Sequence, residues 1–120
     1  MTILSEWQGQ MSAITESGAM VIKDTESWQA FWVQTGQGNA PAVDFERYMV
    51  VAAFLGSKPT GGYAVSIEKI EKKKRKIMIS VKTTKPTNNS FVIQAFTSPY
   101  HIKIIERSAW PVEFKYINEK

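Results

Sequence analysis

The 120-residue sequence contains no cysteine, and His101 is its only histidine. Without thiols, the chain can form neither disulfide bonds nor thiolate metal sites, so its stability must come from packing. A catalytic triad would have to use His101, but no Gly-x-Ser-x-Gly motif is present to supply a nucleophile. Because His101 alternates with apolar residues in a predicted strand, we interpret it as an ordinary surface residue. We therefore predict that the protein is not an enzyme and has no catalytic residues.

Aspartates are also sparse, since Asp24 and Asp44 are the only two. Hard cations need several carboxylates within one loop, and no Asp-x-Asp-x-Asp-Gly run occurs. Asp44 and Glu46 precede a predicted strand, and we interpret them as solvated turn residues rather than as an acid–base pair. We expect no bound metal and no cofactor.

Long apolar runs are missing as well. No stretch approaches the roughly 20 residues that span a bilayer, so no transmembrane segment is expected. The first residues lack the basic and apolar regions of a signal peptide, and none is predicted in this chain. The location stays open between the cytoplasm, if this start is native, and the cell envelope or exterior, if a leader has been removed.

What the sequence does contain is enough apolar material for one core. Apolar residues make up 43% and aromatic residues 12% of the chain, which predicts a single domain over residues 1–120. A helix is predicted at about 24–35, with Asp24 or Thr25 as its N-cap and a glycine-rich stretch after its end. Three aromatic residues share one face of this helix at spacings i, i+3 and i+4, namely Trp28, Phe31 and Trp32. This face should pack on a sheet.

The rest of the chain has the patterns of β-strands. After a short strand at 18–22, strands are predicted at about 48–55, 62–70, 77–84, 91–96, 100–105 and 110–117. Pro111 cannot donate to a ladder, which favours an edge position for the last strand. We predict an α+β fold, a mostly antiparallel β-sheet, sandwich-like or half-barrel-like, with one aromatic-rich helix packed on it.

Two loops share the order Lys-Pro-Thr followed by two residues that tolerate positive φ. The second spans residues 85–89, and the first is continued by a tyrosine: Lys58, Pro59, Thr60, Gly61, Gly62 and Tyr63. Proline stiffens one half of such a loop, and Gly or Asn permits the reversal in the other half. If the strands from 48 to 96 form a meander, both loops emerge at one end and form one surface. Turn chemistry draws on few residue types, so coincidence is the alternative explanation of the match.

Positive charge is concentrated at one predicted turn. The net charge is +4, but eight basic and two acidic residues between Glu68 and Lys85 give that stretch +6. Its centre is an unbroken basic run: Lys72, Lys73, Lys74, Arg75 and Lys76. We interpret the run as a solvated hairpin turn that discourages edge pairing. The alternative is a site for nucleic acid or an anionic surface, although no aromatic residues interleave with the lysines as a stacking platform would require.

The order of these motifs resembles a known family. Val43-Asp44-Phe45 leads into an apolar strand that ends at Gly56, and the Lys58–Tyr63 loop and an alternating strand follow. A strand at 77–81, a proline-containing loop and Ser98-Pro99-Tyr100 before a closing strand complete the pattern. From about 43 to 106 the sequence resembles the PrcB family C-terminal domain, with the helix at 24–35 before this core and the strand at 110–117 beyond it.

The resemblance implies a noncatalytic accessory role. PrcB is a subunit of a bacterial surface protease complex, commonly exported and lipid-anchored, that supports assembly or stability of the protease. We therefore expect a protein partner, such as a protease or its complex, bound by the Lys58–Tyr63 loop; nucleic acid is the less favoured partner. The segment from Pro59 to Tyr63 is also similar to a loop of chagasin-like cysteine protease inhibitors, which insert loops into protease clefts. Inhibition is thus an alternative role.

Overall fold

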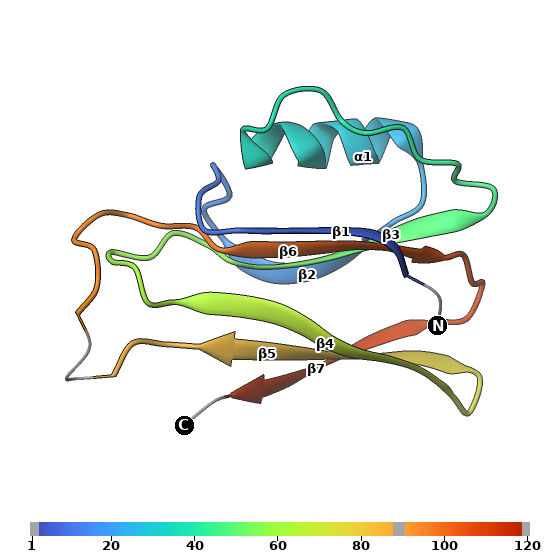
Figure 1. The fold of residues 1–120 in the computed structure, drawn as a ribbon. Coiled ribbons are helices and arrows are strands. Elements are labelled where there is room, and N and C mark those ends of the chain that lie inside the picture. Colours follow the sequence, from blue (N-terminus) through green and yellow to red (C-terminus); the bar gives the residue numbers. More distant parts are fainter. Residues whose placement is uncertain (1–2, 88–90, 119–120) are drawn as a thin grey trace.

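The computed structural model describes residues 3–87 and 91–118, which form two stacked sheets and one helix (Figure 1). The first sheet is antiparallel and has the order β1-β6-β3-β2, from strands β1 (Ile3–Gly9), β6 (Tyr100–Glu106), β3 (Tyr48–Leu55) and β2 (Ser17–Ile22). The second sheet has the order β4-β5-β7, from strands β4 (Ala64–Lys73), β5 (Lys76–Thr84) and β7 (Val112–Asn118). Helix α1 (Thr25–Trp32) continues into a short 3-10 turn, η1 (Val33–Thr35). This is the predicted α+β, sandwich-like architecture, and it is not a closed barrel.

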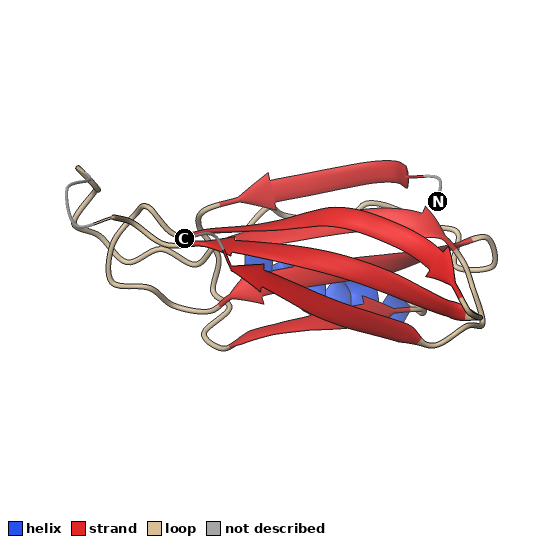
Figure 2. Cartoon of the chain, turned by 90° about the horizontal axis from the view of Figure 1, so that it is seen from below, coloured by secondary structure: helices blue, strands red, loops and turns tan. Residues whose placement is uncertain are grey.

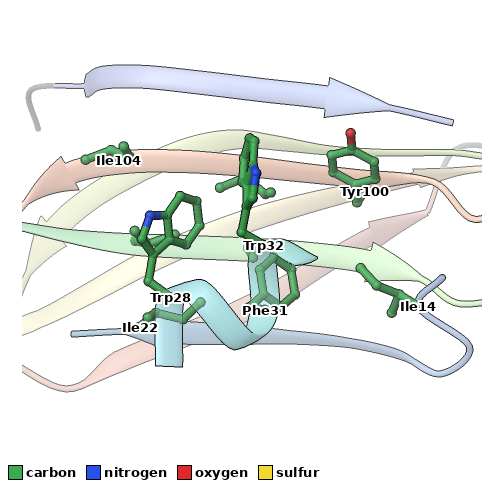
Figure 3. Packing of buried hydrophobic residues seen from close by; sticks show 10 residues of the cluster. Ile14, Ile22, Trp28, Phe31, Trp32, Tyr100 and Ile104 are labelled. Atoms are coloured by element: carbon green, nitrogen blue, oxygen red, sulfur yellow. The ribbon is translucent and has the colours of Figure 1, made fainter. Parts of the chain in front are cut away.

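Helix α1 begins at the predicted cap. The carboxylate of Asp24 accepts the backbone N–H of Ser27 at 2.8 Å, which satisfies one of the free donors of the first turn. Trp28, Phe31 and Trp32 are buried, and they point from the helix onto the first sheet (Figure 3). Trp7 of β1 completes this aromatic cluster, with its ring centroid 5.0 Å from that of Trp32. The predicted aromatic face therefore forms the core between the helix and the first sheet.

A second core lies between the two sheets. In β3, Val50 and Ala52 face the helix, whereas Met49, Val51 and Ala53 face the second sheet. The central strands β3 and β6 are thus covered on both faces, which explains why β3 is an unbroken apolar run. Figure 2 shows the strands of both sheets running along the long axis of the molecule, with the helix on the far side.

The meander predicted for residues 48–96 is wrong. β3 pairs directly with β6 in the first sheet, and the β4–β5 hairpin between them in sequence belongs to the second sheet. The strand predicted at 91–96 is also wrong, because these residues form part of the connection from β5 to β6. Its aromatic and β-branched residues have the composition of a strand, but the segment is not placed in either sheet. The strand predicted at 110–117 is confirmed as the edge strand β7, and it runs parallel to β5.

His101 is not a surface residue, contrary to the expectation from the sequence. Its exposed fraction is 3%, and its side chain lies between the sheets. Nδ1 accepts the backbone N–H of Ile67 in β4 at 2.8 Å, and Nε2 lies 3.0 Å from the carboxylate of Glu6 in β1. Gln8 of β1 likewise donates to the carbonyl of Val65 at 2.9 Å. The alternating pattern was misleading here because β6 is buried on both faces, so neither the odd-numbered nor the even-numbered side chains of the strand face solvent.

Candidate functional site: the loop end

Three connections meet at one end of the sandwich, which we call the loop end (left in Figure 1). They are the β1–β2 connection (residues 10–16), the β3–β4 connection (56–63) and the β5–β6 connection (85–99). The β4–β5 turn lies at the opposite end. The Lys58–Tyr63 loop and residues 85–87 of the second Lys-Pro-Thr loop therefore emerge on the same side, as predicted, although the sheet arrangement that puts them there differs from a meander. Residues 88 and 89 of the second loop lie outside the described residues.

The Lys58–Tyr63 loop is fastened to the β5–β6 connection by its backbone. Lys58 and Thr97 form an isolated antiparallel bridge, with N–O distances of 2.7 and 2.9 Å. Gly61 donates its N–H to the carbonyl of Ile93 at 3.0 Å. The Lys58 ammonium lies 5.3 Å from the centre of the Tyr63 ring, within the range of a cation–π contact. The loop is thus held in one shape by contacts along its length.

The glycine pair allows this close approach. Gly62 has a φ of +89°, and a Cβ there would come within 2.7 Å of Val92 and 2.8 Å of Pro86. A Cβ on Gly61 would lie 2.7 Å from the side chain of Ile93. The contact between Gly62 and Pro86 joins the two Lys-Pro-Thr loops into one surface. Because the Gly61 N–H already donates to Ile93, the two glycines allow close packing of the loops and do not form an anion-binding nest.

Large apolar side chains project from these connections into solvent. Their exposed fractions are 105% for Phe91, 63% for Ile93, 73% for Phe96 and 60% for Met11. We call these four residues the apolar loop residues. Single exposed apolar residues are ordinary, but four in adjoining loops at one end are a feature to explain. A cavity of about 100 Å³ lies beside Met11 and Phe96. Sequence reasoning missed this feature because residues 91–96 were interpreted as a strand.

Hydrogen bonds centred on Ser98 tie the loops together behind these side chains. Ser98 donates its N–H to the carbonyl of Gln10 at 2.8 Å and its hydroxyl to that of Ile14 at 2.6 Å. The hydroxyls of Ser12 and Ser98 are 2.8 Å apart. The β1–β2 connection is therefore fixed to the end of the β5–β6 connection, and the loop end presents its side chains from a braced support.

The basic run forms a tight hairpin turn at the opposite end of the molecule. Lys74 and Arg75 both have positive φ, 51° and 61°, a conformation that non-glycine residues rarely adopt. Lys72 is 3.7 Å from Glu106 and Lys76 is 3.4 Å from Glu113, so the flanks of the turn are ion-paired with β6 and β7. The turn and the Lys58–Tyr63 loop are not brought together, and a single ligand of small size cannot use both.

The carboxylate of Asp44 makes local contacts. Asp44 accepts the backbone N–H of Glu46 at 3.1 Å and lies 3.7 Å from Arg47, as expected of a solvated turn. Within residues 3–87 and 91–118, no three His, Cys, Asp or Glu side chains are grouped closely enough to hold a metal ion. In the same residues, no helix has the length and apolar character needed to cross a bilayer.

The fold and its loops define a small α+β sandwich domain with one braced, partly apolar end. Residues 49–106 match the family model described as PrcB C-terminal. This match supports a PrcB C-terminal domain that runs from β3 through the β4–β5 hairpin to β6. Comparisons with curated proteins and with solved structures gave no match.

Proposed function

We propose that the protein is a noncatalytic protein-binding domain whose contact surface is the loop end. The surface combines the Lys58–Tyr63 loop with the apolar loop residues of the adjoining connections. The observation that carries the proposal is the exposure of Phe91, Ile93 and Phe96 on loops that hydrogen bonds hold in place. Burying such side chains in a partner would remove apolar area from water.

The hydrogen bonds that hold the loops in place are a second argument for binding, besides the exposure of the apolar side chains. A loop that is already ordered loses little conformational entropy when it docks, so a modest contact area gives useful affinity. Aromatic residues, phenylalanine among them, are enriched in protein interfaces relative to the rest of the surface. In this proposal Phe91 and Phe96 insert into the partner, and the Lys58–Tyr63 loop forms a rigid contact surface beside them.

The PrcB C-terminal domain gives this proposal a more particular form. The name of the family suggests that the partner is a component of a bacterial protease complex and that this domain is an accessory or assembly subunit. A chagasin-like inhibitor would use the same loops against a protease cleft. A panel of cysteine and serine proteases assayed with and without the protein separates these roles, because an accessory subunit leaves their activity unchanged.

The basic turn carries the second candidate function, binding to an anionic partner. The specific observation in its favour is the pair of positive φ values at Lys74 and Arg75, since a turn built for stability alone would place Asn or Gly there. Such binding would weaken steeply with salt, whereas contact through the apolar loop residues would not.

Affinity capture from a bacterial extract tests the proposed surface. We compare the unaltered chain with a Phe91→Ser/Phe96→Ser variant, eluting at low and high salt. Leu4→Ser is the matched control, because Leu4 is also apolar and exposed (52%) but lies in β1 toward the opposite end. We expect a protein retained at high salt by the unaltered chain and by the control and lost with the double variant. Equal capture by all three would refute binding through the loop end, and losses confined to a Lys74→Ser/Arg75→Ser variant would move the function to the turn.

A further inference from the structure

The open edge of β7 has unused hydrogen-bonding groups in a regular pattern. Among the described residues, β7 lies at the edge of the second sheet (Figure 1) and pairs with β5 alone. Val112 lies opposite Ile77. The Ile77 N–H donates to the carbonyl of Pro111 at 2.8 Å, so odd-numbered residues of β7 direct their backbone groups toward β5. The N–H and C=O groups of Val112, Phe114 and Tyr116 therefore point away from the sheet. Pro111 belongs to the inward set, and its missing N–H does not obstruct the edge.

The side chains of this edge are complementary to themselves. On the inner face, Val112 and Phe114 are half-buried against the core between the sheets, and Tyr116 is 50% exposed. On the outer face, the exposed residues Glu113 and Lys115 carry opposite charges. A second copy laid antiparallel about Phe114 would place each Glu113 opposite a Lys115, and each Val112 opposite a Tyr116.

We propose that the protein forms a two-fold symmetric dimer in which the β7 edges of two copies pair antiparallel about Phe114. The second sheet then runs continuously through both copies. Val112, Phe114 and Tyr116 form the hydrogen-bonded pairs, and Glu113 and Lys115 form the closer, non-hydrogen-bonded pairs, whose Cα atoms are about 4.5 Å apart. Each interface is the same patch on both copies, as two-fold symmetry requires.

The charges select this register over its neighbours. Moving the two-fold axis to Glu113 would bring two glutamates face to face, and moving it to Lys115 would do the same with two lysines. Like charges directly opposite each other destabilise a strand pair, whereas opposite charges stabilise it. The axis at Phe114 is the one of these three that gives two favourable pairs. Lys115, which would normally protect an edge strand from pairing, becomes a specificity device.

Sedimentation equilibrium of the full chain, from roughly 1 µM to 1 mM, tests the dimer through a charge-swap cycle. Glu113→Lys and Lys115→Glu each create two like-charged pairs across the axis, and each should raise the dissociation constant by roughly tenfold or more. The double variant Glu113→Lys/Lys115→Glu restores both opposite-charge pairs, so it should recover most of the affinity. Lys69→Glu, an exposed change on β4 at the far side of the same sheet, should leave dimerisation unaltered.

A backbone variant checks the hydrogen bonds independently of charge. Tyr116→Pro removes an N–H that faces outward, so the dimer should be lost while the β5 pairing of the strand remains intact. Far-UV circular dichroism and the melting temperature at low concentration establish that each variant is folded. A chain that stays monomeric to 1 mM overturns the proposal, as does a dimer that survives the single charge changes or a double variant that folds but is not rescued. The Phe91→Ser/Phe96→Ser variant should still dimerise, which keeps this test separate from that of the loop end.

Discussion

Replacing His101 by leucine should destabilise the protein because it removes a hydrogen-bond acceptor from between the sheets. The Ile67 N–H donates to Nδ1, so that nitrogen carries no proton, and Nε2 must be the one that donates to Glu6. Leucine fills much of the space of the imidazole but accepts no hydrogen bond. His101→Leu therefore leaves a buried backbone N–H without its partner, and it also removes the side-chain hydrogen bond to Glu6 of β1.

The expected loss of unfolding free energy is about 2–4 kcal/mol. An unsatisfied buried donor costs about 1–3 kcal/mol, and the changed side-chain shape adds up to about 1.5 kcal/mol. The Glu6 contact contributes little, about 0–1 kcal/mol, because that side chain is half exposed. His101→Asn is the matched variant, since its amide oxygen can occupy the position of Nδ1 and accept the Ile67 N–H. It should be about 1 kcal/mol milder than His101→Leu.

The same geometry predicts how stability depends on pH. Burial lowers the pKa of His101 below its ordinary value of 6.5, against the opposing effect of the hydrogen bond to Glu6; Lys103 lowers it further and Glu68 raises it. The folded state therefore binds fewer protons than the unfolded state. Stability is fully present above pH 6.5 and is lost as the pH falls below that value, with a slope of at most about 1.4 kcal/mol per pH unit for one proton.

Urea denaturation of the three proteins at pH 7.5 and at pH 5.5 measures both effects. Because the chain has one histidine, the unaltered protein should lose stability between these values, and His101→Leu should lose far less. The reasoning is refuted if His101→Leu unfolds within about 0.5 kcal/mol of the unaltered protein at pH 7.5, or if it keeps the same pH dependence.

Three further changes test other parts of the structure. Gly62→Val combines positive φ with overlap against the facing loop and should lower the unfolding free energy by about 2 kcal/mol or more, whereas Gly38→Val, which also has positive φ but open space, should cost less in the same urea titration. Trp28→Phe removes an indole N–H that donates to a backbone carbonyl at 2.8 Å and leaves a cavity under the helix, so a loss of about 1–3 kcal/mol is expected; a change below 0.5 kcal/mol would contradict this packing. Lys74→Asn/Arg75→Gly should raise the melting temperature, because asparagine and glycine adopt positive φ with about 1 kcal/mol less strain than lysine and arginine. An unchanged or lower melting temperature would show that the turn is not strained.

Local sequence patterns predicted the parts of the fold that depend on local chemistry. Asp24 caps the helix and Trp28 lies on its buried face, since capping and i, i+4 spacing involve only neighbouring residues. The bounds predicted for β3, residues 48–55, match the structure, because an uninterrupted apolar run is a signature of a strand covered on both sides.

The errors have a common origin in contacts between distant segments. Residues 91–96 form a connection and not a strand because β3 pairs directly with β6. The sequence of that segment contains no signal for this distant pairing. His101 is buried because β4, far from it in sequence, crosses under β6 and offers the N–H of Ile67. Periodicity describes one strand at a time and does not tell which strands have neighbours on both faces.

The sequence predicted the Lys58–Tyr63 loop of the candidate site but not the exposed phenylalanines beside it. The stiff and permissive halves of the two Lys-Pro-Thr loops indicated a shared surface, and the contact between Gly62 and Pro86 is the structural form of that similarity. The exposure of Phe91 and Phe96 was hidden because aromatic residues favour strands as strongly as they favour interfaces. Protein binding through these residues stays a prediction until the capture experiment is done.

The pairing of β1 with β6 also dictates when this protein can fold during its synthesis. Ile3 lies opposite Ile105, so β1 cannot pair until the ribosome has made β6, about a hundred residues later. A nascent chain that has emerged only as far as residue 99 presents α1 and β1 without β6, the strand that lies between β1 and β3. The β4–β5 hairpin has no such delay, because its strands are consecutive and joined by a tight turn. Nascent chains should therefore stay sensitive to protease until β6 has emerged, and then become resistant within a short additional length.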